Sequence, residues 1–330
     1  MPPRRPAGPP ERRPNALVVL SGLHPSLPES EALACAPSRV VARRERLLLI
    51  ETAFPDALDR LAYATLVLDF LGVGTFDSLP FVAAEVVRGT YAVRVSRVPA
   101  EQRQQLYRLV WRALADPQVS LRRPDTELHA FVLPDGVWWA RLRRRIGDPD
   151  FADRRLESRP FFRSYGTQPR KSRCMVNLTG IRAGQRLLDP CCGTGSFLIE
   201  AALMGVEAFG SDGDAVAVAG ARTNLEALGL KAELRQLDAR RLDAWGLGFD
   251  AIVCDLPYGR SASTSGVMTN KLYGQILEAS ALVLPRGGVA VFAAPLEMLP
   301  VPGDQFVVLE RHREFVHRSL AREITVLARH

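Results

Sequence analysis

The chain carries the stretch RLLDPCCGTGSF at residues 186–197, and this stretch decides how the second half folds. Apolar residues leading into Asp189 are typical of the end of a buried strand, and an apolar segment with helical spacing follows the turn. The paired glycines Gly193 and Gly195 let the backbone approach a ligand closely. A dinucleotide fingerprint needs a third small residue where Leu198 stands, which disfavours a nicotinamide site. A carboxylate at position 189 suits a cationic group, such as an amino acid ammonium, better than a pyrophosphate.

Apolar segments alternate with helical segments around this turn. We expect strands at 186–189, 206–212, 232–237, 249–255 and 288–294, helices at 197–204, 215–228 and 271–284, and a final antiparallel pair from 306–310 and 323–327. Asp214 is the expected N-cap of the second helix. Apolar strands that alternate with helices indicate a mostly parallel sheet covered on both faces. The predicted class is therefore α/β, with a Rossmann-like arrangement.

Acidic residues end three successive strands of this predicted sheet. Asp189 ends the first strand, Asp212 follows Gly195 by 17 residues at the end of the second, and Asp238 ends the third. Ligands of open parallel sheets bind beyond the carboxyl ends of the strands. A carboxylate at position 212 can accept hydrogen bonds from ribose hydroxyls, and one at 238 can accept from an adenine amine. Together with the glycine turn, the three acids indicate a site for an adenosine joined to an amino acid.

The fourth strand ends in the segment DLPYGR at residues 255–260. An aromatic amine on a base is a poor nucleophile because its lone pair is delocalised into the ring. Asp255 can accept one N–H of such an amine, and a backbone carbonyl beside Pro257 can accept the other. Tyr258 can stack on the face of the base. The segment Asp255, Leu256, Pro257 and Tyr258 therefore predicts a site that orients a base amine for attack.

The first half has shorter, mixed elements and is predicted to be α+β. We expect strands at 16–21, 47–50, 65–68 and 91–98, a helix at 101–115, and a hairpin of 127–132 and 137–142 around Pro134-Asp135-Gly136. The predicted boundaries give a disordered basic tail at 1–14, an α+β domain at 15–146, a linker at 147–167 and an α/β domain at 168–330. A basic stretch at 141–173 has 11 Lys and Arg against 4 Asp and Glu. Within it, Arg143, Arg144 and Arg145 are candidates for contacting RNA phosphates, the alternative being a solvated connector.

The basic charge is concentrated in the first half. The net charge is +7, and residues 1–165 hold 25 Arg, no Lys and 19 Asp and Glu, which gives +6. A phosphate-rich partner would explain this imbalance. No apolar run is long enough to span a membrane, and the start lacks the apolar segment of a signal peptide. The five cysteines contain no Cys-x-x-Cys pair and the five histidines show no ligand spacing, so we expect reduced thiols, no metal and a cytoplasmic protein.

The motifs resemble a known family. Residues 189–195 followed by 255–258 are similar to methyltransferases with the Asp/Asn-Pro-Pro-Tyr motif, in which Leu256 replaces the commoner first proline. The segments RPFF at 159–162 and PRKSRCMVNL at 169–178 are similar to the entry segment of archaeal and eukaryotic tRNA guanine-N2 methyltransferases acting at position 10. The segment VSLRRPD at 119–125 looks like part of the RNA-binding THUMP domain that those enzymes carry.

This resemblance implies S-adenosyl-L-methionine as donor, guanine N2 as acceptor and tRNA as partner. It also implies that 15–146 is a THUMP-containing RNA-binding domain and 168–330 the methyltransferase catalytic domain. Asp189, Gly193, Gly195, Asp212 and Asp238 would bind the donor, and the motif at 255–258 would be catalytic. The number of methyl groups transferred, one or two, is left open. A monomer is the default expectation for the oligomeric state. Methylation of guanine N2 in rRNA or of adenine N6 is the alternative activity, and a non-catalytic RNA-binding protein is the alternative of another class.

Overall fold

The computed structural model describes residues 14–96, 98–164, 166–257, 266–301, 303–317 and 320–330. These residues form two compact units. One comprises 23–35, 60–63 and 147–330, and the other comprises the remaining residues up to Ile146. No helix in the described ranges has both the length and the apolar character needed to cross a membrane.

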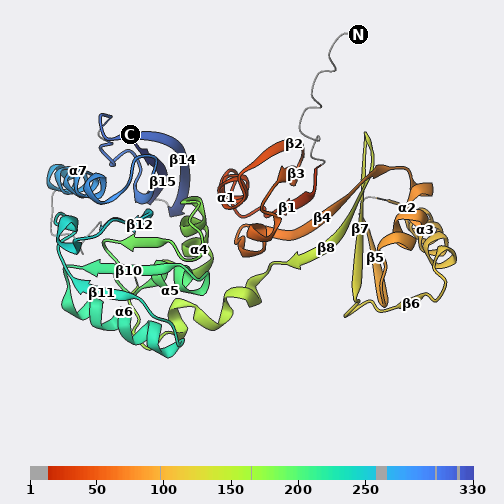
Figure 1. Ribbon diagram of the computed structural model, residues 1–330, viewed down its shortest axis with the longest axis horizontal. Helices are drawn as coiled ribbons and strands as arrows, with labels where there is room; N and C mark the ends of the chain where they lie inside the picture. Colours follow the sequence, from red (N-terminus) through yellow and green to blue (C-terminus); the bar gives the residue numbers. More distant parts are fainter. Residues whose placement is uncertain (1–13, 97, 165, 258–265, 302, 318–319) are drawn as a thin grey trace, which may run out of the picture. The chain divides into compact units, whose positions relative to one another are not determined.

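The unit that ends the chain is built on a seven-stranded sheet (Figure 1). Its strands are β9 (Arg186–Asp189), β10 (Glu207–Asp212), β11 (Glu233–Gln236), β12 (Ala251–Asp255), β13 (Val289–Pro295), β14 (Phe306–His317) and β15 (Leu320–Arg329). The order is β11-β10-β9-β12-β13-β15-β14, and every pairing is parallel except those made by β15. The predicted α/β class and the final antiparallel pair are therefore confirmed.

This strand order places the first strand in the middle of the sheet. Strand β9 lies between β10 and β12, so the direction in which the chain fills the sheet reverses beside it. A reversal of this kind opens a crevice at the carboxyl ends of the strands, where ligands of such folds bind. Asp189 ends β9 and Asp255 ends β12, on the two sides of that point.

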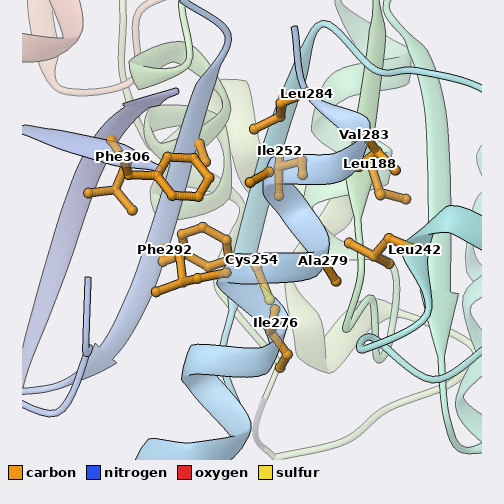
Figure 2. Packing of buried hydrophobic residues seen from close by; sticks show 14 of the residues in the cluster. Leu188, Leu242, Ile252, Cys254, Ile276, Ala279, Val283, Leu284, Phe292 and Phe306 are labelled. Carbon is orange, nitrogen blue, oxygen red and sulfur yellow. The ribbon is translucent and has the colours of Figure 1, made fainter. Parts of the chain in front are cut away.

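Helices connect and cover the strands of this unit. They are α1 (Leu27–Cys35), α4 (Pro169–Leu178), α5 (Ser196–Leu203), α6 (Ala215–Ala227) and α7 (Gly266–Val283), with short 3-10 turns η3 (Asp148–Arg154), η4 (Leu156–Ser158) and η5 (Leu242–Trp245). Figure 2 shows part of the core, in which Ile276 and Leu284 belong to one buried cluster with Ile252 and Phe292 of the central strands. The central strands β9, β12 and β13 are buried because helices cover both faces of the sheet there, whereas β11 at the edge is more exposed.

The other unit contains an eight-stranded mixed sheet in the order β2-β3-β1-β4-β8-β7-β5-β6. Its strands are β1 (Ala16–Leu20), β2 (Ser38–Arg44), β3 (Leu47–Thr52), β4 (Ala64–Gly74), β5 (Thr90–Ser96), β6 (Gln118–Val119), β7 (Thr126–Leu133) and β8 (Gly136–Arg145). Two helices, α2 (Leu79–Val86) and α3 (Ala100–Ala113), pack against each other, and η1 (Pro55–Arg60) and η2 (Phe76–Ser78) are 3-10 turns. The α+β class and the hairpin around Gly136 are confirmed.

Several elements were not predicted or extend beyond their predicted bounds. Strands β2 and β6 and helices α1, α2 and α4 were not predicted. Helix α7 begins at Gly266 rather than Lys271, and β14 and β15 are about twice as long as expected. The paired strands are longer than the apolar segments that predict them. The reason is that backbone hydrogen bonds between antiparallel strands continue beyond the residues whose side chains are buried.

The compact units also depart from chain order. Residues 23–35 and 60–63 belong with the last unit, although they come from the half predicted to bind RNA. A fully buried carboxylate explains this, because Glu31 accepts hydrogen bonds from the backbone N–H of Ala62 and of Tyr63, each at 2.8 Å, and from Asn177 Nδ2 at 2.7 Å. Burial raises the pKa of Glu31, and these bonds oppose that rise.

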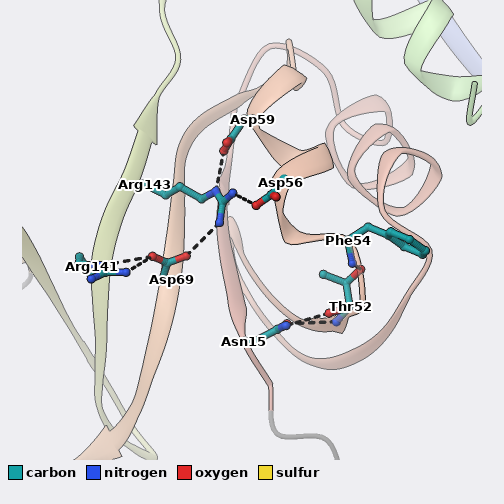
Figure 3. A network of polar contacts seen from close by, with 8 residues as sticks. All are labelled: Asn15, Thr52, Phe54, Asp56, Asp59, Asp69, Arg141 and Arg143. Atoms are coloured by element: carbon teal, nitrogen blue, oxygen red, sulfur yellow. Dashed lines mark hydrogen bonds and ion pairs between the residues drawn. The ribbon is translucent and has the colours of Figure 1, made fainter. Parts of the chain in front are cut away.

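The arginine run is the end of strand β8 and not a separate connector. Figure 3 shows Arg143 bound by three carboxylates of its own unit: Asp59 at 2.9 Å, Asp69 at 3.4 Å, and Asp56. Arg145 pairs with Glu127 at 2.6 Å. The composition of the run could not reveal these partners because the acids lie 74 to 87 residues earlier in the chain for Arg143.

Candidate active site

The glycine turn after β9 has the backbone conformation that its sequence predicts. Gly193 has φ of 50° and Gly195 has φ of 80°, both in the left-handed region that favours glycine. A Cβ atom on Gly195 would lie 3.3 Å from the Cβ of Ala221 on α6, so a side chain there would press on the neighbouring helix. Gly195 also donates its N–H to the carbonyl of Cys192 at 2.7 Å. The turn is therefore tight and preformed.

Asp189 is a buried carboxylate with an incomplete set of partners. Its side chain is 1% exposed, and Oδ1 accepts the N–H of Cys191 at 3.2 Å. Oδ2 has no hydrogen-bond partner in the part of the chain that the structure describes. Burial raises the pKa of Asp189 well above its usual range, and the nearby carboxylates of Asp212 and Asp255 raise it further. A cationic ligand group would satisfy the orphaned oxygen and compensate the buried charge.

Asp212 joins the second strand to the glycine turn. Its Oδ2 accepts the N–H of Gly193 at 3.0 Å, and its Oδ1 accepts the N–H of Asp214 at 2.9 Å. Asp214 itself caps α6 by accepting the N–H of Val216 at 2.8 Å, as predicted. Each oxygen of Asp212 keeps lone pairs for further donors. The carboxylate is thus fixed in place and can still receive ligand hydroxyls.

Asp238 lies near Asp212 at the edge of a cavity of about 670 Å³. The cavity is lined by residues that follow β9, β10, β11 and β12, among them Pro190, Cys191, Asp212, Gln236, Asp238, Ala239, Pro257 and Ile276. Its volume falls in the range usual for small-molecule sites. Both oxygens of Asp238 accept hydrogen bonds from the guanidinium of Arg240, which lowers the pKa of the carboxyl. The structure therefore brings the second and third predicted strand-end acids to one cavity.

Asp255 is held by two side chains that the sequence analysis did not single out. Thr167 Oγ1 donates to Asp255 Oδ2 at 2.9 Å, and Arg322 pairs with Oδ1. Thr167 precedes α4 in the segment predicted as a linker, and Arg322 lies on β15. No spacing signal connects either residue to the fourth strand, because both contacts depend on how distant strands and loops meet.

The two residues after Asp255 are also fixed. Leu256 donates its N–H to the carbonyl of Ala293 at 2.9 Å, which continues the β12–β13 ladder by one residue. A proline at position 256 could not make this bond. The buried Tyr273 donates its hydroxyl to the carbonyl of Pro257 at 2.8 Å and so anchors the turn from α7. The predicted stacking residue Tyr258 lies outside the described residues.

The arginine run lies in the other unit, and its three members differ. Arg143 is largely occupied by aspartates, whereas the side chains of Arg144 and Arg145 are exposed. Their predicted contact with RNA stays a prediction. Within the described ranges, no group of three or more acidic, His or Cys side chains is placed to bind a metal ion.

Comparison with known proteins agrees with this geometry. The family described as RMKL-like, methyltransferase domain matches residues 157–324. The tRNA (guanine(10)-N2)-dimethyltransferase of Methanothermobacter thermautotrophicus is 35% identical to this chain and covers 95% of it and 99% of the relative. The protein of the same name from Pyrococcus abyssi is 32% identical and covers 94% of this chain and 98% of the relative.

A solved structure shares the fold. The crystal structure of TrmN from Thermus thermophilus superposes with a TM-score of 0.52 at 21% identity, covering 96% of this chain and 100% of that chain. From the domain match and the two relatives that align along nearly their whole length, the chain belongs to the tRNA (guanine(10)-N2)-dimethyltransferase family.

Proposed function

We propose that this protein transfers methyl groups from S-adenosyl-L-methionine to the exocyclic N2 amine of guanosine 10 in tRNA, to give the dimethylated base. The observation that carries the proposal is the arrangement at the reversal of strand order. There a hydrogen-bond acceptor for an amine, Asp255, lies beside a buried carboxylate and a glycine turn suited to an amino acid and a nucleoside. The names of the two full-length relatives supply the nucleotide and the second methyl group.

The donor site consists of the glycine turn and the three strand-end acids. S-adenosylmethionine supplies a methyl group bonded to a positively charged sulfur. In each transfer the amine nitrogen bonds to this carbon as the carbon–sulfur bond breaks, so that S-adenosylhomocysteine leaves and the amine gives up one proton to water. Asp189 Oδ2, buried and without a partner in the described chain, would accept the ammonium of the donor. Asp212 would accept the ribose hydroxyls, since the backbone already holds its carboxylate in place. Asp238 would accept the adenine amine in the cavity that it lines together with Asp212.

The target amine is oriented by the end of β12. Asp255 accepts one N–H and the carbonyl of Leu256 accepts the other, so that the lone pair of the nitrogen points toward the donor. Pro257 has no N–H of its own that could compete at this turn. Holding the reacting atoms in line supplies much of the rate in such reactions. Stacking of Tyr258 on the base remains part of this proposal.

The target base must leave its helix before it can reach this site. A paired amine inside a stem is not accessible, so the nucleotide is extruded or already unpaired. The basic unit that contains the eight-stranded sheet contributes phosphate contacts that position the RNA without reading its sequence. Arg144 and Arg145 are assigned to this role because their side chains are exposed on β8, even though Arg145 also pairs with Glu127. Arg143 is less exposed and is held by three aspartates, which assigns that residue to the fold.

A set of arginine variants tests this division of roles. Changing both Arg144 and Arg145 to Gln is expected to weaken tRNA binding across sequences. The slope of the logarithm of the binding constant against the logarithm of the salt concentration should become shallower by about one to two. Arg143→Gln is expected to leave that slope nearly unchanged and to lower the free energy of unfolding by roughly 1–2 kcal/mol, because Asp59 and Asp69 lose their shared partner. Binding isotherms at several salt concentrations and thermal melts measure both effects. An equal loss of slope in all variants would refute the division.

The activity itself is tested with methyl-labelled donor and unmodified tRNA. We expect N2,N2-dimethylguanosine at position 10, located by nuclease mapping and nucleoside analysis. A transcript with adenosine at position 10 is the matched control and should stay unlabelled. Label in ribosomal RNA, or label recovered as N6-methyladenosine, would contradict the proposal.

A further inference from the structure

Both oxygens of Asp255 are engaged by side chains from distant parts of the chain. Thr167 lies 88 residues before Asp255 and binds Oδ2 at 2.9 Å, and Arg322 lies 67 residues after it and pairs with Oδ1. The side chain of Arg322 is 6% exposed, and that of Asp255 is 15% exposed. Contacts this well shielded from water are stronger than surface pairs and restrict rotation of the carboxylate.

The two partners are themselves anchored. Ser172, on the first turns of α4, donates its hydroxyl to the carbonyl of Thr167 at 3.2 Å. Arg322 belongs to β15, where it stands opposite Pro295 of β13 and Glu314 of β14. The plane of the Asp255 carboxylate is therefore set by a helix start on one side and a central strand on the other.

This arrangement leaves room for a substrate amine. An ionised carboxylate has about four lone-pair directions, and Thr167 and Arg322 use one on each oxygen in the described contacts. The guanidinium of Arg322 also offsets the negative charge of Asp255. The carboxylate can then act as a fixed, nearly neutralised acceptor for an N–H group rather than as a mobile anion.

We propose that Thr167 and Arg322 are positioning residues that orient Asp255 toward the target amine and that matter most for the second methyl transfer. The proposal rests on the proposed dimethylation. An unmethylated amine has two N–H groups and is held by two acceptors. The monomethylated amine keeps one N–H, so its lone pair is aligned by one acceptor alone. Loss of a fixed carboxylate plane should therefore impair the second transfer more than the first.

The test measures the ratio of monomethyl to dimethyl product at equal total methyl incorporation. Thr167→Val and Arg322→Lys are each expected to lower kcat about tenfold and to raise this ratio several-fold, with the Kd for the donor within about twofold of wild type. Thr167→Ser keeps the hydroxyl and should restore the wild-type ratio. The ratio does not depend on the fraction of folded enzyme, so simple destabilisation would not change it.

Matched controls remove similar groups elsewhere in the same unit. Thr223→Val deletes a hydroxyl bonded to the carbonyl of Ala219 on α6, and Arg329→Lys alters the arginine that binds the carbonyl of Leu284 from the same strand as Arg322. Both controls should keep the wild-type ratio and kcat. Wild-type behaviour of Thr167→Val would overturn the proposal.

A double-variant cycle shows whether the effect passes through Asp255. If it does, Thr167→Val should cause no further loss of single-turnover rate in an Asp255→Ala background. An additive loss would overturn the positioning role. If the wild-type protein labels a different RNA amine, the proposed target is wrong, and the same cycle measured on that amine still decides the role of Thr167.

Discussion

Replacing Asp255 by Ala is expected to lower turnover by about two orders of magnitude or more, while the Kd for S-adenosylmethionine changes by less than about twofold. The reason is that the variant loses an acceptor needed to align the amine and keeps the groups assigned to the donor. Asp189, Asp212 and the glycine turn make their hydrogen bonds without help from Asp255.

Single-turnover kinetics with labelled donor and calorimetric titration measure the two quantities separately. Asp243→Ala is a suitable control, because Asp243 is an exposed acid of the same unit with a weak contact to Arg241 at 3.9 Å. Thermal melts are needed beside the kinetics, since the change also removes the carboxylate that pairs with the buried Arg322. Turnover near the wild-type value in a folded variant would show that Asp255 has no part in catalysis.

The residues that the sequence could locate are those at the ends of individual strands. Asp189, Asp212 and Asp255 each end a largely apolar strand, and Asp238 follows the mixed strand β11. Parallel strands bring their carboxyl ends to the same edge of the sheet. A local pattern therefore predicted where these four carboxylates lie in the sheet, and their roles in binding and catalysis stay part of the proposal. Asp214 was similarly predictable because capping is a contact between near neighbours in the chain.

The residues that the sequence could not locate depend on contacts between segments with no shared pattern. Thr167 and Arg322 meet at Asp255 because a helix start and an antiparallel strand converge there. Glu31 looks like an ordinary surface acid in sequence, yet it is fully buried and ties two early segments to α4. Arg143 shows the reverse problem, since a run of like charges gives no sign that three aspartates surround one member.

Asp189→Asn is expected to weaken donor binding by about tenfold or more and, at the same time, to stabilise the ligand-free protein. The amide keeps the shape of the carboxylate and carries no charge, so it loses the attraction to the ammonium of the donor. Without donor, the wild-type side chain is a buried acid with one oxygen that has no partner in the described chain. Asn keeps a polar amide in the same place and removes only the buried charge, a gain of about 1–3 kcal/mol, which corresponds to several degrees in the melting temperature of a unit this size.

The stability difference between Asp189→Asn and wild type should depend on pH. This dependence distinguishes the loss of a buried charge from an improvement in packing. Burial raises the pKa of Asp189 in the folded protein, so the folded state holds this proton more tightly than the unfolded state. In the pH range above the ordinary value for Asp, the folded state therefore binds more protons, and the wild-type contribution falls as pH rises. Asn does not titrate, so the stability advantage of the variant should grow from pH 5 to pH 8, as measured by thermal melts without donor. Saturating donor should shift the melting temperature of wild type far more than that of the variant. An advantage that is the same at both pH values, or an unchanged donor-induced shift, would mean that Asp189 is not the carboxylate that receives the ammonium.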